Sequence, residues 1–277
     1  MRRSLPARPA VWGGLARWYT HAVLLAVDVG NTTTVLGMYQ GEALVASWRV
    51  ATDRRRMADE YAVLFGRLLE MEGLEPPREA ILSSVVPPVG PELSAALERY
   101  WGVRARLVSA DLVAPLLKVD TDDPREVGAD RMVNAVAALE YEGDAFIVVD
   151  FGTATNFDVV VRPNRLIGVA LAPGPGVAAE ALFSHAAKLP RVDLVAPERA
   201  IGRNTVSALQ SGLVFGYAAM VDGMVERLAA EVDGAHGRPV VIATGGFADV
   251  VRPHARRIDV TDPLLTLRGL RLIADRA

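Results

Sequence analysis

Two short segments, one in each half of the 277-residue chain, place an aspartate, a glycine and threonines where a strand turns back on itself. They begin at Asp28 and at Asp150, which are 122 residues apart. A glycine there lets backbone N–H groups and Thr hydroxyls point at one anion, and the aspartate can hold a cation that bridges phosphate oxygens. Either turn alone would also suit an ordinary hairpin. As a pair they predict a site that grips a polyphosphate.

A third segment with chemical potential is the turn Thr244-Gly245-Gly246, which ends an apolar run and precedes a predicted helix. Glycine at such a turn permits close approach of a flat ligand such as adenosine and exposes a helix N-terminus. Strand-Gly-Gly-helix is also common packing. This turn therefore supports a nucleotide site only together with the other two.

Asp130 and Arg131 open a helix that we expect to begin near Gly128. A carboxylate within reach of a substrate hydroxyl can act as a general base, and a guanidinium can pair with a carboxylate or a phosphoryl group. Its position alone favours another interpretation of Asp130, as an exposed first-turn acid stabilised by the helix dipole.

The composition excludes several other kinds of chemistry. The chain has no Cys and only four scattered His, which argues against disulfides, thiolate zinc sites, Cys nucleophiles and His metal sites. Of the 30 basic residues only Lys118 and Lys188 are lysine, and neither follows a glycine-rich turn, so there is no Walker A loop. A net charge of -3 without a basic stripe argues against nucleic-acid binding.

Residues 1–22 are expected to form a disordered N-terminal extension, with a targeting peptide as the alternative. They contain four Arg and no acid, but the apolar run that follows, residues 22–27, is too short for a signal h-region or a membrane span. We therefore expect a cytoplasmic protein without membrane contact.

The elements that position these segments follow from hydrophobic periodicity. The order strand-strand-strand-helix occurs twice, which indicates an internal duplication with domains at residues 23–142 and 143–277. In the first half we predict strands at 23–29, 33–39, 44–50, 80–85 and 105–108, and helices at 58–71, 91–100 and 128–141. In the second half we predict strands at 145–150, 154–161, 165–171, 239–243 and 257–260, and helices at 177–187, 204–232, from about 246, and at 264–274.

Five motifs in order resemble the type III pantothenate kinases, which are members of the actin, sugar kinase and Hsp70 superfamily. The resemblance covers almost all of residues 24–275. The motifs are residues 28–32 (DVGNT), 128–131 (GADR), 150–155 (DFGTAT), 172–174 (APG) and 201–205 (IGRNT). The resemblance implies an α/β fold of duplicated actin-like (ribonuclease H-like) domains, with mixed five-stranded sheets flanked by helices around an interdomain cleft.

The resemblance also implies an activity: ATP-dependent phosphorylation of pantothenate, the first step toward coenzyme A, in a homodimer. Asp130 would be the general base, Asp28 would hold Mg²⁺ through water, and Asp150 would hold a monovalent cation, K⁺ or NH₄⁺. Nucleotide contacts are expected from Asp28, Val29, Gly30, Asn31, Thr32, Thr33, Thr34, Val35, Gly152, Thr153, Gly245 and Gly246. Substrate contacts are expected from Thr121, Gly128, Ala129, Asp130, Arg131 and, across the dimer interface, Thr205.

The chain departs from the family pattern at three places. Thr121 stands where the family usually has a tyrosine near the pantothenate, Asn156 stands where Thr is usual, and Gly168 stands alone where a Gly pair is common. Two other hypotheses therefore stay open: a non-catalytic nucleotide-binding accessory or regulatory protein, and an enzyme acting on another small polyol or acid, or hydrolysing a polyphosphate. Glycines 212, 216 and 223 in the long predicted helix favour a helix–helix contact between subunits, with packing inside the chain as the alternative.

Overall fold

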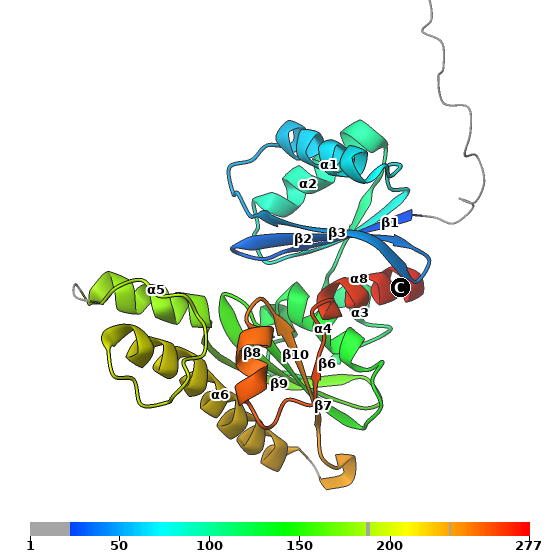
Figure 1. Cartoon of the computed structure of the whole chain (residues 1–277). Coiled ribbons are helices and arrows are strands. Elements are labelled where there is room, and N and C mark those ends of the chain that lie inside the picture. Colours follow the sequence, from blue (N-terminus) through cyan, green and yellow to red (C-terminus); the bar gives the residue numbers. More distant parts are fainter. Residues whose placement is uncertain (1–22, 187–188, 233) are drawn as a thin grey trace, which may run out of the picture.

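The computed structural model describes residues 23–186, 189–232 and 234–277, and it contains two sheets with helices between and outside them (Figure 1). The predicted N-terminal extension, residues 1–22, lies outside the described residues.

The first sheet has five strands in the order β3-β2-β1-β4-β5. β1 pairs antiparallel with β2, β2 pairs antiparallel with β3, and β4 and β5 continue parallel to β1. Its outer face is covered by α1 and α2 (Figure 1). The bounds are β1 Val23–Val29, β2 Thr33–Gln40, β3 Ala43–Ala51, α1 Ala58–Glu72, β4 Glu79–Ser84, α2 Val89–Trp101 and β5 Ala105–Leu107.

The second sheet repeats this pattern but has six strands, in the order β11-β10-β7-β8-β9-β6. The prediction of five strands is wrong here because β6 (Lys118–Val119) comes from the first half of the chain and pairs parallel with β9. Two residues are too few for a hydrophobic period to reveal. The other bounds are β7 Ala145–Phe151, β8 Ala154–Val161, β9 Arg165–Pro173, α5 Pro175–His185, α6 Thr205–Glu231, β10 Val240–Gly245, α7 Ala248–Val251 and β11 Val260–Thr261.

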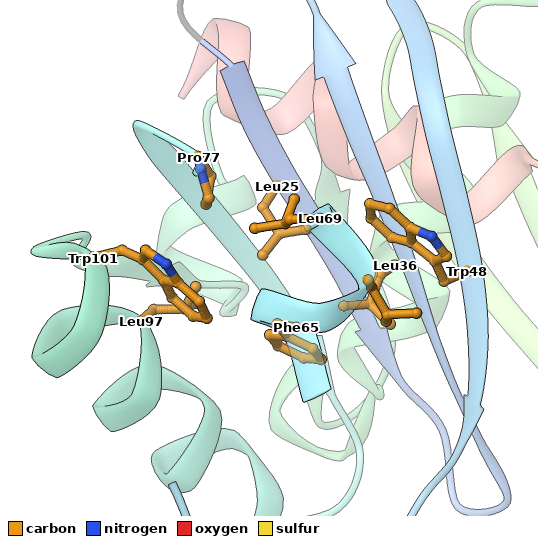
Figure 2. A pocket seen from close by; sticks show the side chains of 9 residues that line it. Leu25, Leu36, Trp48, Phe65, Leu69, Pro77, Leu97 and Trp101 are labelled. Carbon is orange, nitrogen blue, oxygen red and sulfur yellow. The ribbon is translucent and has the colours of Figure 1, made fainter. Parts of the chain in front are cut away.

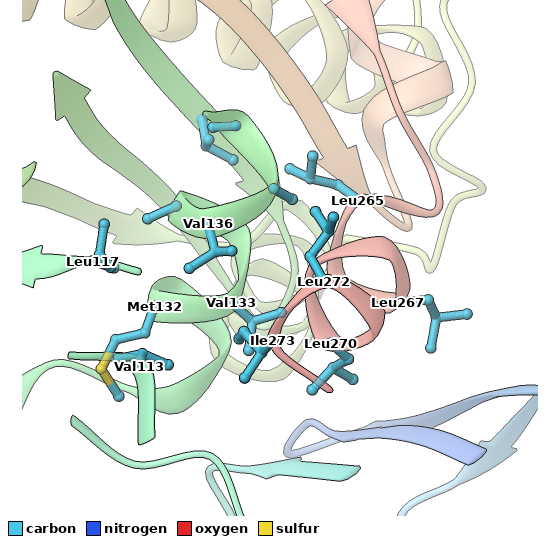
Figure 3. Close-up of a cluster of buried hydrophobic side chains, with 14 of the residues drawn as sticks. Val113, Leu117, Met132, Val133, Val136, Leu265, Leu267, Leu270, Leu272 and Ile273 are labelled. Atoms are coloured by element: carbon cyan, nitrogen blue, oxygen red, sulfur yellow. The ribbon is translucent and has the colours of Figure 1, made fainter. Parts of the chain in front are cut away.

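Two helices, α4 (Ala129–Ala138) and α8 (Leu265–Arg276), pack against each other between the sheets (Figures 1 and 3). Their approach is close because Gly269 has no side chain: a Cβ there would lie 2.3 Å from the backbone oxygen of Val133. α8 also contacts β1, β2 and β4 of the first sheet, although it ends the chain. The helices thus contribute to one core that draws on both halves, and the domain boundary near residue 142 stays a prediction.

Four shorter segments complete the chain. α3 (Ala110–Val113) and three 3₁₀ turns carry little hydrophobic pattern and were not predicted. The 3₁₀ turns are Pro124–Glu126, Gly234–His236 and Arg252–His254.

By length and composition alone, α6 could cross a membrane. In this structure one stripe of it packs on the second sheet, through residues such as Tyr217, Val221 and Val225. Glycines 212, 216 and 223 lie on the exposed side, where nothing is within 4 Å of a Cβ position. The alternative that these glycines pack inside the chain is therefore not what the structure shows. Asn204 caps the helix, its side chain accepting from the N–H of Ser207 at 2.9 Å.

Between α1, α2 and the first sheet lies a small gap (Figure 2). Gly66 of α1 faces this region, since a Cβ there would lie 3.8 Å from Trp101 Cζ2. Its lining is almost entirely apolar, so we interpret the gap as loose packing. Its lining is Leu25, Leu36, Trp48, Phe65, Leu68, Leu69, Pro77, Leu97 and Trp101.

Candidate functional site

The two duplicated turns face each other across the space between the sheets. The hydroxyl of Thr32 in the first turn lies 3.2 Å from the hydroxyl of Thr153 in the second. Each turn is closed by its own glycine: Gly30 N–H donates to Thr33 at 3.1 Å, and Gly152 N–H donates to Ala154 at 2.9 Å. Both Thr side chains are exposed, so their hydroxyls are available to a ligand.

The first turn is held by a residue just after β3 that sequence reasoning missed. The Thr52 hydroxyl donates to the backbone oxygen of Gly30 at 2.7 Å and lies 2.9 Å from the Thr34 hydroxyl. The Thr52 N–H donates to the Thr32 oxygen at 3.0 Å. Arg54 donates to the side-chain oxygen of Asn31 at 2.9 Å. A Thr at the end of an edge strand carries no signal of this contact, because the pairing that creates it is long-range.

The second turn can form only because two other segments lack side chains there. A Cβ at Gly174 would lie 2.1 Å from the Gly152 oxygen, and one at Gly245 would lie 2.5 Å from Asp150 Oδ1. Gly245 also has a φ of +89°, which disfavours any other residue. The Thr-Gly-Gly turn thus packs directly beside the aspartate of the second turn.

Three aspartates share one electrostatic neighbourhood near these turns. Burial, followed by the charges of Asp130 and Asp150, raises the pKa of Asp28 to about 7. Burial and then the charge of Asp130 raise the pKa of Asp150 to about 6. Burial also raises the pKa of Asp130. A bound cation would relieve both the desolvation and the mutual repulsion, so these oxygen donors fit Mg²⁺ or a monovalent cation.

No group of three His, Cys, Asp or Glu side chains is arranged to chelate a metal within the ranges that the structure describes. Each expected cation would therefore depend on one aspartate, together with water, backbone and nucleotide oxygens. The assignment of Mg²⁺ to Asp28 and of a monovalent cation to Asp150 stays a prediction.

Asp130 lies in the first turn of α4, where its Oδ1 accepts from the N–H of Arg131 at 2.9 Å. Gly128 makes room for this conformation, since a Cβ at that position would lie 2.6 Å from the same oxygen. The glycine of the Gly-Ala-Asp-Arg motif thus has a steric role: it leaves space for the carboxylate at the start of the helix.

Asn134, one turn further along α4, links Asp150 to the C-terminal helix. Its amide donates to Asp150 Oδ2 at 3.3 Å, and its oxygen accepts from the Thr266 hydroxyl at 2.8 Å. Only 1% of Asn134 is exposed. Sequence reasoning missed it, although an Asn within the apolar face of a helix is an available signal of a buried hydrogen-bond partner.

Further side chains with unpartnered buried oxygens, among them those of Asp158, Asn156 and Thr121, belong to or follow the second sheet. Asp158 on β8 is fully buried, and neither of its carboxylate oxygens has a hydrogen-bond partner among the described residues. Burial raises its pKa to about 8, while the charge of Arg131 opposes the shift. Thr121 and Asn156 each have one buried unpartnered oxygen as well. Sequence reasoning noted Thr121 and Asn156 but missed Asp158, an acid inside an apolar run.

Not every predicted site residue is brought to these turns. Thr205 is the exposed first residue of α6, and no hydrogen bond joins it to another predicted site residue within the described part of the chain. The side chain of Val29 is buried under α1 and α2, so only its backbone could meet a ligand. Gly246, Ala129 and Thr33 lie in or beside the turns already described.

Comparison with known proteins identifies the family. The model of the type III pantothenate kinases matches residues 24–227. A type III pantothenate kinase of Thermus thermophilus is 54% identical over 250 residues, which cover 90% of this chain and 97% of that protein. One from Deinococcus radiodurans is 52% identical over 89% of this chain and 94% of that protein. The chain belongs to the type III pantothenate kinase family. This is a family of phosphotransferases.

Solved structures show the fold. A putative 2-dehydro-3-deoxygalactonokinase from Sinorhizobium meliloti aligns with a TM-score of 0.58 and 15% identity over 91% of this chain and 95% of that one. A putative Baf family transcriptional activator from Campylobacter jejuni aligns with a TM-score of 0.54 and 17% identity over 91% and 97%. The predicted actin-like α/β fold is confirmed, and at such low identity these likenesses say nothing about activity.

Proposed function

We propose that the chain transfers the γ-phosphoryl group of ATP to the primary hydroxyl of pantothenate, giving 4′-phosphopantothenate in the first step of coenzyme A biosynthesis. The observation that carries this is the meeting of the two phosphate turns at Thr32 and Thr153, in a member of the type III pantothenate kinase family. Asp130 belongs to the same electrostatic neighbourhood as Asp28 and Asp150.

We assign Asp130 as the group that orients the acceptor hydroxyl and takes up its proton. A phosphoryl transfer of the loose type needs the nucleophile positioned and the developing charge neutralised more than it needs a strong base. The carboxylate is held by the Arg131 N–H and is raised in pKa by burial, which brings its proton affinity nearer to neutral pH. Arg131 would pair with an anionic group of the substrate.

The expected nucleotide contacts fall into three sets. Thr32, Thr153 and the glycine N–H groups would donate to phosphate oxygens, Gly245 and Gly246 would border the adenosine, and Asp28 and Asp150 would hold the cations. Mg²⁺ through Asp28 and K⁺ or NH₄⁺ at Asp150 would supply positive charge against the polyphosphate. The protein's own part in this proposal is to bring the groups that donate to the phosphates and the carboxylates that hold the cations together.

A homodimer would cover the exposed face of the second half of the chain. Glycines 212 and 216, one helical turn apart on α6, leave room for a second helix to approach. Exposed apolar side chains, such as those of Leu171 on β9 and Leu182 on α5, extend the surface. A partner would also explain why Thr205 stands apart from the site within one chain. Light scattering on the wild type and on Gly216→Leu tests this: the variant should be monomeric.

Cytoplasmic location and the absence of nucleic-acid and membrane partners stay predictions from the sequence. The regulatory alternative is not favoured, because the named curated relatives are kinases and Asp28, Asp130 and Asp150 are all present.

The test of the proposed function is product identification. Purified protein, MgATP and K⁺ are incubated with pantothenate and, in parallel, with other small hydroxy acids and polyols, and the products are examined by mass spectrometry and ³¹P NMR. A phosphomonoester of pantothenate at its primary hydroxyl supports the proposal. Turnover of another acceptor alone, or hydrolysis of ATP without an acceptor, would refute it.

A further inference from the structure

Arg49 lies on the same face of the first sheet as Asp28. In the strand register Asp28 on β1 is opposite Val35 on β2, and Val35 is opposite Arg49 on β3. Residues directly opposite each other in a ladder point to the same side, and three adjacent strands span about 10 Å. The flanking residues Trp48 and Val50 pack with the core under α1 and α2, so the Arg49 side chain points the other way, toward the second half.

The guanidinium reaches the second half of the molecule. Its Nη2 lies 3.6 Å from the position that a Cβ would occupy on Gly246, in the Thr-Gly-Gly turn. The same turn packs against Asp150 through Gly245. Arg49 therefore crosses from the first sheet to the Thr-Gly-Gly turn, which packs beside Asp150, and a side chain on Gly246 would face it.

No residue in the described ranges neutralises the positive charge of Arg49. Its guanidinium forms no hydrogen bond and no ion pair with any residue in the described ranges, whereas the neighbouring Arg54 and Arg55 contact Asn31 and Asp53. The one described lysine, Lys118, pairs with Asp120 beside β6, at the edge of the second sheet. A free guanidinium among inward-facing phosphate turns is suited to a polyanion, because it offers several N–H donors to phosphate oxygens.

We propose that Arg49 binds the polyphosphate of the nucleotide and supplies the fixed positive charge that a lysine supplies in Walker-type sites. This deepens the proposed function and rests on it for the identity of the nucleotide. With Asp28 and its cation on one side and Arg49 about two strands away on the other, the polyphosphate is held between an ion and a guanidinium. The two threonine-bearing turns close it in.

The test measures nucleotide binding without the acceptor. Calorimetric titrations with MgADP and with adenosine compare the wild type, Arg49→Gln, Arg49→Lys and the matched control Arg55→Gln. The Arg55 side chain is 94% exposed and belongs to the same arginine-rich segment. Loss of a charge-assisted contact should weaken MgADP binding about tenfold to hundredfold in Arg49→Gln. Adenosine binding and the control should be unchanged, and Arg49→Lys should recover part of the loss.

Equal losses for adenosine and MgADP, or unchanged MgADP affinity in Arg49→Gln, would overturn the assignment. A thermal melt of each variant shows whether it is folded, and Arg49→Lys keeps the test valid if Arg49→Gln is not. Wild-type protein that binds MgADP but fails to phosphorylate pantothenate would refute the proposed acceptor and leave the Arg49 result standing. Wild-type protein that binds no nucleotide would refute both.

Discussion

The hydroxyls of Thr32 and Thr153 lie 3.2 Å apart although 121 residues separate them in the chain. Each belongs to a strand-turn-strand unit with an aspartate near the end of its first strand, and each turn is closed by a glycine N–H. The contact therefore joins the two copies of a duplicated unit at the points where each would meet a phosphate. Both hydroxyls are exposed, so the contact itself contributes little to folding, and its importance should lie in binding.

This contact predicts that the two threonines act as a unit toward nucleotide. Thr32→Ala and Thr153→Ala should each weaken MgADP binding, and the double variant should lose less than the two single losses together, because either substitution already removes the shared geometry. A double-mutant cycle measured by calorimetry checks this. Strictly additive losses would show that the two turns bind independently.

Asp130→Asn should lower kcat by about 10²- to 10⁴-fold while MgADP binding stays near the wild-type value, because the amide cannot accept the acceptor's proton. Steady-state kinetics and calorimetry on the same preparation measure the two effects. Asp111→Asn is the matched control, since Asp111 is also a first-turn acid but is exposed at the start of α3. Loss of nucleotide binding in Asp130→Asn would place Asp130 among the cation or phosphate ligands instead.

The pH dependence of folding should reveal Asp158. Its pKa is about 8 in the folded chain, and the ordinary value of 3.8 applies to the unfolded chain. Between these two pH values the unfolded chain has released a proton that the folded chain keeps. Asp158 therefore favours folding most below about pH 4, and this contribution is lost as the pH rises toward 8. The melting temperature of the wild type should decrease as the pH rises from 5 to 8. The decrease should be smaller in Asp158→Asn.

Asp28 and Asp150, with pKa values of about 7 and 6, add slopes of the same sign. They are present in both proteins, so the difference between the wild type and Asp158→Asn isolates Asp158. A variant whose melting temperature falls as steeply as that of the wild type would show that Asp158 is ionised in the folded chain.

Two glycine substitutions should have opposite effects. Gly66→Ala replaces a helix-weakening residue of α1 and adds a methyl group at ordinary contact distance from Trp101 of α2. It should therefore stabilise the protein by about 1 kcal/mol. Gly245→Ala should destabilise it by about 1–3 kcal/mol, because the φ of +89° disfavours alanine and the Cβ meets Asp150. Thermal melting measures both. A destabilised Gly66→Ala would show that the gap near Trp101 cannot admit a methyl group.

The sequence allowed good prediction of the elements that have a strong period. The strands at residues 23–51 and 145–173 and the helices α1 and α6 lie close to their expected positions, because each alternates or repeats over many residues. β6 and α3 are two and four residues long, too short for any period. The helix expected to reach residue 141 ends at Ala138, and in the turn that follows the backbone oxygens of Leu139 and Tyr141 accept from the distant Arg162.

The candidate site divides in the same way. Asp28 and Asp150 could be predicted because each belongs to a repeated local motif, which can be recognised from the sequence alone. Asn134 donates to Asp150 on a distant element, and Arg49 lies beside Gly246 of another, so the identity of these neighbours could not be predicted from any local pattern. Thr205, predicted only through the resemblance, has no described partner within one chain.

The most direct test of the account is the rate of ADP release in potassium buffer with MgATP, measured with and without pantothenate in a coupled assay. The account predicts release that depends on pantothenate, that falls when Na⁺ replaces K⁺, and that disappears in Asp130→Asn. Release at the same rate without pantothenate, or none with it in a protein that binds MgADP, would contradict the account.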